Sequence, residues 1–350
     1  MAWCSQFLTE CGLPILPRMT DRSITKQRRS TQPNQRFQWS PWRMLRGMPE
    51  LPDVTVYVES LIPRVVGQTI EAIRLASPFV VRTVTPPIAS LAGTRVVGVR
   101  RLAKRVVLEF EDDVFLAIHL MISGRLHWRA RGAKAPGKIG LAMFDFAEGT
   151  LVLTEASSKK RAAIHVVRGE DALRALDRGG LEVMDASLED FQSVVRSENH
   201  TIKRTMTDPR LFSAIGNAYS DEILHRARLS PIRLTQKMSD EEIERLYLAT
   251  RETLREWIER LREEATTRFP DKVTAFRPEM AVHGRYGLPC PVCGDPVQRI
   301  VYAENECNYC PGCQTEGRLL ADRSLSRLLK GDWPRTLDEL EDRRVAATSG

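Results

Sequence analysis

The chain has 350 residues, of which 42% are hydrophobic and 28% are charged. This length and composition are typical of a soluble globular protein with two or three domains. No apolar run comes near the roughly 18 residues that a membrane-spanning helix needs, which excludes a membrane protein. The formal net charge is +7, but residues 1–47 hold six more basic than acidic residues and the remainder is close to neutral. Evidence for a nucleic-acid partner must therefore come from local motifs.

The first 47 residues differ from the rest of the chain. They are rich in Arg, Ser, Gln, Thr and Pro, contain three of the six tryptophans and show no helical or strand period. We expect a disordered extension, or residues that precede a true start at Met48. An Arg-rich organellar leader and a partner-binding segment are the alternatives.

From Met48 onwards the pattern predicts a helix followed by many strands. Apolar residues at three- and four-residue spacing predict a helix over 52–67, which Pro63 must end or kink. Short β-branched segments separated by turn residues then predict an antiparallel sandwich or barrel. The expected strands are Thr69–Leu75, Thr94–Arg101, Arg105–Phe110, Val114–Leu120, Gly140–Phe146, Leu151–Glu155 and Ala162–Val167.

After Gly179 and Gly180 the apolar period lengthens to that of helices. A Ser followed by acidic residues predicts a capped helix start at Ser187. The expected helices are Ser187–Ser197, His200–Thr205, Pro209–Ile215, Ser220–Arg228 and Ser239–Ala265. A further helix is expected in the C-terminal tail, so the order is a β domain, a helical domain and a cysteine-rich segment.

The cysteine-rich segment is the most specific local signal. The chain has seven cysteines and no secretory signal, and five of the seven fall between residues 290 and 313, which argues against a disulfide framework and for a reducing, cytoplasmic compartment. Two C-x-x-C pairs predict one structural Zn²⁺ with four thiolate ligands, since no coordination position stays open. The ligands are Cys290, Cys293, Cys310 and Cys313. Pairing of Cys307 with Cys310 is an alternative, and a redox dithiol is a weaker one.

A second signal lies at Met48, Pro49 and Glu50. If Met48 is the initiator and is removed, Pro49 becomes a secondary amine at the chain terminus. An α-amine has a pKa near 8, so part of it is neutral and nucleophilic at physiological pH. Such an amine can attack an electrophilic sugar carbon, and Glu50 can supply a proton to the departing oxygen.

The sequence resembles the formamidopyrimidine-DNA glycosylase / endonuclease VIII family of base-excision-repair enzymes over essentially all of residues 49–314. The motifs that carry the resemblance are Pro-Glu-Leu-Pro at 49–52, Arg-Leu-Ala-Lys at 101–104, His-Leu-Met-Ile-Ser-Gly at 119–124, Ile-Gly-Asn-Ala-Tyr-Ser-Asp-Glu at 215–222, Val-His-Gly-Arg at 282–285 and the cysteine pairs. Each motif is modest alone, and their order and spacing together are highly specific.

The resemblance implies an α+β multidomain fold. The expected parts are a catalytic antiparallel β-sandwich with a flanking helix over 49–180, a helix–two-turn–helix domain over 181–275, a zinc-ribbon β-hairpin over 276–315 and a tail over 316–350. It also implies that Pro49 forms a Schiff base with C1′ of the damaged nucleotide and that Glu50 is the acid. Lys104 is expected to assist strand cleavage, and Lys203 and Asn217 to hold phosphate. A solvated strand lysine and a simple turn residue are the structural alternatives for Lys104 and Asn217.

Local basic clusters support a DNA substrate. An enzyme that acts on a base must take it out of the stack, which calls for a cleft and a side chain that fills the void. Basic residues at 100–105 and 159–161 are candidates for phosphate contact. The expected DNA-binding residues beside Lys203 and Asn217 are Arg101, Lys159, Lys160, Arg161 and, as void filler, Ile122.

Three departures from the family pattern concern lesion recognition. Asp53 stands where the family often has Glu, the loop 156–162 has no aromatic wedge, and Asn305 falls where the family's hairpin arginine is expected. Two functions follow. The first is a DNA glycosylase with abasic-site lyase activity on oxidised bases or abasic sites, acting as a monomer on damaged double-stranded DNA. The second is a relative that binds damaged DNA with weak or no glycosylase activity. The sequence leaves the lesion preference, the opposite base and β- versus β,δ-elimination open.

Overall fold

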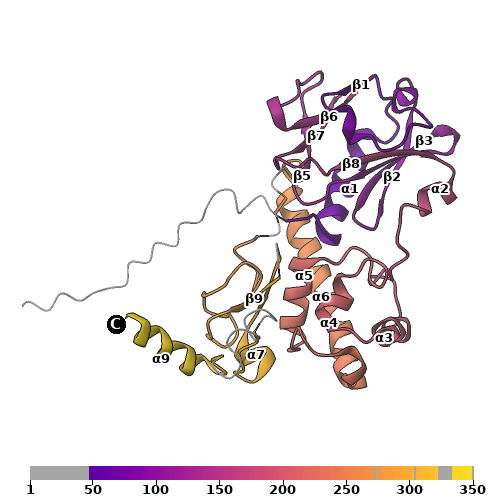
Figure 1. The fold of residues 1–350 in the computed structure, drawn as a ribbon. Helices are drawn as coiled ribbons and strands as arrows, with labels where there is room; N and C mark the ends of the chain where they lie inside the picture. The colour runs from indigo at the N-terminus through magenta and orange to yellow at the C-terminus, as the bar shows by residue number, and fades with distance from the viewer. Residues whose placement is uncertain (1–46, 272, 275, 303–304, 322–332, 349–350) are drawn as a thin grey trace, which may run out of the picture. The chain divides into compact units, whose positions relative to one another are not determined.

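The computed structural model describes residues 47–271, 273–274, 276–302, 305–321 and 333–348 (Figure 1). The expected extension over 1–47 therefore lies outside the described residues, apart from Gly47. None of the helices within the described ranges is long and apolar enough to cross a membrane.

Helix α1 (Leu51–Val65) begins directly after the Pro49–Glu50 pair. Glu50 is its N-cap, and the backbone N–H of Glu50 donates to Oδ2 of Asp53 at 3.0 Å, which closes a capping box. Pro63 was expected to end or kink the helix, and the first of these is wrong, because α1 runs through Pro63 to Val65. A proline in the last turn removes only one hydrogen bond of the helix, so the helix tolerates it there.

Two four-stranded antiparallel sheets follow α1, in the orders β1-β6-β7-β5 and β2-β3-β4-β8. The expected antiparallel sandwich is confirmed. The core contains residues of α1 and of both sheets, including Val54, Leu108 and Phe144. The strands are β1 (Ala72–Leu75), β2 (Val96–Leu102), β3 (Arg105–Phe110), β4 (Val114–His119), β5 (Gly124–Arg129), β6 (Gly140–Phe146), β7 (Gly149–Glu155) and β8 (Ala163–Arg168). Short 3₁₀ turns lie at η1 (Pro78–Val80), η2 (Ile88–Leu91), η3 (Glu111–Asp113) and η4 (Gly137–Ile139).

The sequence pattern missed strand β5. Leu126 and Trp128 alternate there with Arg125, His127 and Arg129, and the basic residues hid the period of two. Arg125 is nevertheless buried, because its guanidinium Nε donates to the Val273 carbonyl at 2.6 Å. A long-range partner thus places a charged residue at a strand position that faces the protein interior.

The helical part has five α-helices within the described residues after β8. They are α2 (Glu170–Arg174), α3 (Leu188–Ser197), α4 (Ile202–Thr207), α5 (Asn217–Arg226) and α6 (Asp240–Ala265), with the 3₁₀ turn η5 (Thr235–Lys237) before α6. The helix expected over Pro209–Ile215 is wrong. The backbone of this segment pairs instead with Leu181, whose N–H donates to Leu211 O and whose carbonyl accepts from Ser213 N, both at 2.9 Å. Helix α6 contacts α1, α3 and α5, and so joins the two parts of the fold.

The cysteine-rich segment forms the expected hairpin. Strands β9 (Gln298–Tyr302) and β10 (Asn305–Tyr309) pair antiparallel, and α7 (Pro311–Thr315) follows. Helix α5 contacts both β10 and α7, so the hairpin packs on the helical part. The tail carries α9 (Leu337–Thr348), where a helix was expected.

Candidate functional site

The Glu50 carboxylate packs against the backbone of the first turn of helix α5. It accepts backbone hydrogen bonds from Gly216 at 2.6 Å, Ala218 at 2.9 Å and Tyr219 at 3.3 Å, and it is 2% exposed. The first N–H groups of a helix have no partner within the helix and form its positive end, so a carboxylate is favoured there. The N–H of Leu51 also donates to Ala214 O at 3.0 Å. The start of the sandwich part is thereby fixed on the helical part.

Lys104 reaches the same point from the turn between β2 and β3. It follows Ala103, which has a φ of 51°, so Lys104 lies in a tight turn and not on a strand as expected. A β-carbon on Gly216 would lie 2.5 Å from Glu50 Cδ and 2.8 Å from Lys104 Nζ. Burial lowers the pKa of Lys104, and the Glu50 carboxylate opposes that shift. The two predicted catalytic side chains therefore converge on the N-cap of α5.

Pro49 is buried beside this pair, and its nitrogen is bonded to Met48 in the 350-residue chain. The segment before it is held, because Arg125 Nη2 donates to the Gly47 carbonyl at 3.0 Å. Burial raises the pKa of Asp53 to about 6, although Arg277 at 3.6 Å lowers it. The shorter side chain of Asp53 thus still closes the capping box that positions Glu50.

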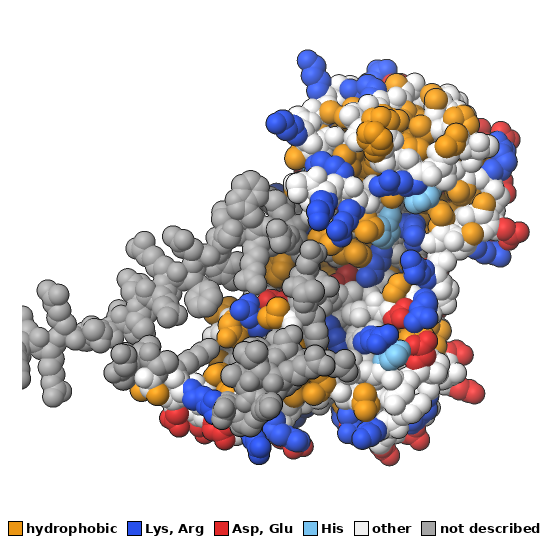
Figure 2. Space-filling model, viewed as in Figure 1, with side chains coloured by type: hydrophobic (Ala, Val, Ile, Leu, Met, Phe, Trp, Pro, Cys, Tyr) orange, Lys and Arg blue, Asp and Glu red, His pale blue; other side chains and the backbone are white. Residues whose placement is uncertain are grey.

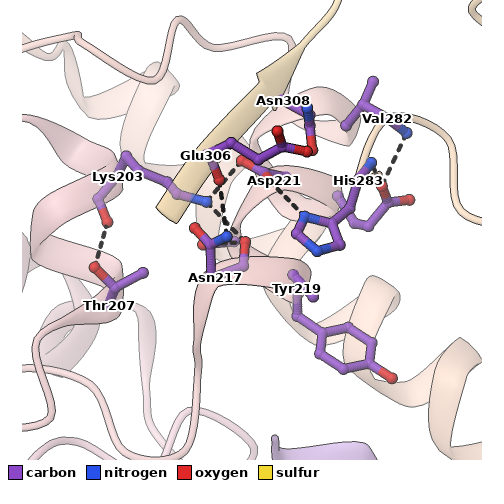
Figure 3. Close-up of polar contacts among 12 residues, drawn as sticks. Lys203, Thr207, Asn217, Tyr219, Asp221, Val282, His283, Glu306 and Asn308 are labelled. Atoms are coloured by element: carbon purple, nitrogen blue, oxygen red, sulfur yellow. Dashed lines mark hydrogen bonds and ion pairs between the residues drawn. The ribbon is translucent and has the colours of Figure 1, made fainter. Parts of the chain in front are cut away.

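Lys203 and Asn217, the two residues expected to hold phosphate, lie together (Figure 3). Lys203 Nζ donates to the Asn217 carbonyl at 2.7 Å and forms an ion pair with Asp221 at 2.6 Å. The Asn217 amide donates to the Glu306 carbonyl of β10 at 2.8 Å. Helices α4 and α5 and strand β10 therefore each contribute to one polar cluster.

Asp221 links the Lys203 side chain of this cluster to His283. It is completely buried and also accepts from Nδ1 of His283 at 2.8 Å. Burial disfavours its charge, but Lys203 and His283 outweigh burial and lower the pKa of Asp221. The imidazole of His283 stacks on Phe276 with 5.3 Å between ring centroids. An ionised Asp221 therefore holds the lysine in one orientation.

The other expected DNA-binding side chains differ in their exposure and in how much of their hydrogen-bonding capacity is used within the protein. Arg101 forms an ion pair with Glu182 at 2.5 Å and is 19% exposed, so most of its hydrogen-bonding capacity is used inside the protein. Lys159, Lys160 and Arg161 are all exposed, and Lys160 donates to the Glu155 carbonyl. Ile122 is half-buried in the turn before β5. Figure 2 shows Lys, Arg and His side chains gathered where the sandwich part meets the helical part.

The two C-x-x-C pairs lie close together, and Cys290, Cys310 and Cys313 share one group of donor atoms within 4.8 Å of one another, while Cys293 groups with Cys310 and Asp295. Sulfur–sulfur distances are 3.8 Å for Cys290 and Cys313 and 3.3 Å for Cys293 and Cys310. Thiolates at this separation suit a tetrahedral ion such as zinc, so the residues present fit a structural metal. Cys307 belongs to a separate apolar cluster with Ile300 and Tyr309, and burial raises the pKa of its thiol.

Sequence reasoning missed several residues inside the motifs that it quoted. Gly216, Asp221 and His283 received no role, nor did Glu222, whose carboxylate accepts from the backbone N–H groups of residues 281–283 at 2.7 to 2.9 Å. The sequence reasoning also missed His225, which lies three residues beyond the motif at 215–222 and whose Nε2 lies 3.3 Å from Cys290 Sγ. Acidic residues in the middle of a helix motif and histidines near cysteine pairs are the signals that could have found them.

Comparisons with known proteins show the family and the fold. Residues 48–163 match the formamidopyrimidine-DNA glycosylase N-terminal domain, and residues 181–269 match the formamidopyrimidine-DNA glycosylase H2TH domain. A formamidopyrimidine-DNA glycosylase of Thermus thermophilus is 33% identical over 277 residues, which cover 77% of this chain and 100% of the relative. An uncharacterized formamidopyrimidine-DNA glycosylase-like protein of Mycobacterium tuberculosis is 40% identical over 152 residues, covering 43% of this chain and 94% of that protein. Among solved structures, a complex of the Lactococcus lactis Fpg with DNA that contains an abasic site matches with a TM-score of 0.68 and 26% identity, over 76% of this chain and 99% of that one.

Proposed function

Because this chain belongs to the formamidopyrimidine-DNA glycosylase family, we propose that it is a base-excision-repair DNA glycosylase with abasic-site lyase activity and that Pro49 is its nucleophile. Glu50, which directly follows Pro49 in the chain, and Lys104 converge at Gly216. This convergence is the observation that carries the proposal. The matched family region begins at residue 48, which supports an active chain that begins at Pro49.

The proposed chemistry needs a free Pro49 amine. Its nitrogen attacks C1′ of the damaged nucleotide as the bond from C1′ to the base breaks, and the base leaves with the bonding electrons and takes a proton from water. The Glu50 carboxylate accepts the proton that the Pro49 nitrogen loses and passes it to the ring oxygen O4′. As O4′ is protonated, the nitrogen lone pair breaks the C1′–O4′ bond, which opens the sugar and leaves an iminium. A proton then leaves C2′ and the bond from C3′ to its phosphate oxygen breaks, which cuts the strand. Lys104, whose Nζ lies beside Glu50 at Gly216, is proposed to contact the backbone that is cut.

Strand cleavage tests this function directly. A chain that begins at Pro49 is incubated with duplexes that carry an abasic site, an oxidised purine or an oxidised pyrimidine. Cleavage of the abasic duplex supports the proposal, and the two lesion duplexes report base preference. Tight binding of the abasic duplex without cleavage would replace it with the damaged-DNA-binding alternative.

Lys203 and Asn217 are proposed to anchor phosphate without reading sequence. Replacement of Lys203 by Ala is expected to weaken binding to damaged and undamaged duplexes alike. It should also reduce the slope of log K against log salt concentration by about one, as expected when one phosphate contact is lost. Fluorescence anisotropy at several salt concentrations measures both effects. A loss confined to one lesion, with undamaged DNA unaffected, would contradict this role.

The two cysteine pairs are proposed to hold one structural zinc ion. Cys310→Ser is expected to release the metal and destabilise the hairpin, because metal binding supplies folding free energy in such modules. Cys307→Ser is the matched control and should keep the metal, since Cys307 lies in the separate apolar cluster. Metal analysis of freshly purified protein measures both, and wild-type protein without zinc would overturn the proposal. We further propose that the protein acts as a cytoplasmic monomer.

A further inference from the structure

Helix α5 brings an imidazole to the cysteine cluster. His225, in the last turn of α5, is 6% exposed, and its Nε2 lies 3.3 Å from Cys290 Sγ. The donor atoms of His225, Cys290, Cys310 and Cys313 all lie within 4.8 Å of one another. The cysteine spacing does not account for this histidine, which lies 65 residues before Cys290.

Together with Cys293, which lies 3.3 Å from Cys310 and outside that group of four, the imidazole makes five donors at a site that needs four. Structural zinc is almost always four-coordinate, and the pairs Cys290–Cys313 and Cys293–Cys310 already supply four thiolates. Four thiolates around one Zn²⁺ leave a net charge of −2 at the site, and an N–H donor beside a ligand sulfur stabilises that charge. We propose that His225 is a positioning residue whose Nε2–H donates to the Cys290 thiolate, an inference that rests on the proposed zinc site.

The His225–Cys290 contact is one of several that attach the cysteine-rich segment to α5. One turn earlier on the helix, Glu222 accepts the backbone N–H groups of residues 281–283, just before this segment. Beyond the helix end, the Leu229 carbonyl accepts from the Gln314 amide at 2.9 Å. At the other end of α5, its first turn holds the Glu50 carboxylate. One ten-residue helix thus contacts the candidate catalytic acid at its start and the candidate metal ligands at its end.

Two substitutions separate the hydrogen bond from simple packing. His225→Phe keeps a ring of similar size and removes the donor. His225→Gln keeps an Nε2–H near the same position. His200→Phe is the control, because His200 is half-buried and its Nε2 lies 2.8 Å from the Glu198 carboxylate and not at the cysteines. Circular dichroism establishes that each variant is folded.

Metal affinity is the primary readout. Competition with a chromogenic chelator is expected to show about tenfold weaker zinc binding for His225→Phe. A loss of this size is usual when a residue that hydrogen-bonds to a metal ligand is removed. His225→Gln and His200→Phe should stay within about twofold of the wild type. The visible absorption of the Co²⁺-substituted protein should indicate four sulfur ligands in the wild type and in His225→Phe, because the imidazole contacts a ligand and not the metal.

Three results would overturn the inference. Unchanged zinc affinity in His225→Phe would show that the hydrogen bond contributes nothing. An equal loss in His225→Gln would show that ring packing, and not the donor, matters. A Co²⁺ spectrum with one nitrogen ligand that disappears in His225→Phe would make His225 a direct ligand. Wild-type protein that binds no metal would overturn the zinc proposal itself. Failure of the His225 inference alone looks different, because His225→Phe would then bind zinc with wild-type affinity.

Discussion

A chain that begins at Pro49 is expected to form a covalent adduct with abasic DNA that sodium borohydride traps, whereas the intact 350-residue chain is expected to form none. In the intact chain the nitrogen of Pro49 is a tertiary amide, whose lone pair is delocalised into the Met48 carbonyl. It carries no hydrogen to lose, so it cannot form the iminium that borohydride reduces. Gel electrophoresis of the cross-linked product measures the difference.

Pro49→Gly tests whether the amine alone is sufficient. A chain that begins with Gly at this position has a primary amine and should retain part of the trapping activity, since imine formation needs an amine more than a ring. Mass spectrometry must first establish where each chain begins. An intact chain of 350 residues that traps DNA as efficiently as the shortened one would contradict the proposed nucleophile.

Gly216→Ala is expected to lower kcat for strand cleavage by about 100-fold, the scale of loss when reacting groups move by about 1 Å. The new β-carbon would lie 2.5 Å from Glu50 Cδ and 2.8 Å from Lys104 Nζ, so both side chains must move. The backbone of Gly216 has φ −133° and ψ −157°, which any residue adopts. Unfolding free energy should also fall, by about 1 to 3 kcal/mol, because the displaced Glu50 carboxylate is buried and loses hydrogen bonds to the backbone.

Gly98→Ala is the matched control for this substitution. Its β-carbon would also meet a carboxylate at 2.5 Å, here that of Glu109, which pairs with Arg100 on the sheet β2-β3-β4-β8. The steric conflict is of the same kind, but no candidate catalytic group is displaced, so kcat should stay near the wild-type value. Single-turnover cleavage and urea unfolding of both variants measure the two effects. Gly216→Ala with wild-type kcat would refute the convergence of Glu50 and Lys104 on the reacting sugar.

Strand and helix prediction succeeded where local pattern and burial agree. Strands β3 and β6 match their expected bounds, because their apolar residues are continuous or alternate cleanly. Strand β5 was missed because Arg125 and His127 are charged or polar residues whose partners, Val273 and Asp271, lie more than 140 residues away. The helix expected over Pro209–Ile215 was wrong because the backbone of that segment pairs with Leu181.

The sequence by itself determined which covalent and metal chemistry could be proposed for this protein. The order Met48, Pro49, Glu50 means that the proposed nucleophile needs a shortened chain, and two C-x-x-C pairs predict the proposed thiolate set, because bonded neighbours and short spacings are local properties. Only the tertiary structure decided that Glu50 and Lys104 meet at Gly216 and that His225 contacts Cys290. These contacts join residues more than 50 positions apart, and packing between α1, α5, the β2–β3 turn and the cysteine module places them, which no local pattern encodes.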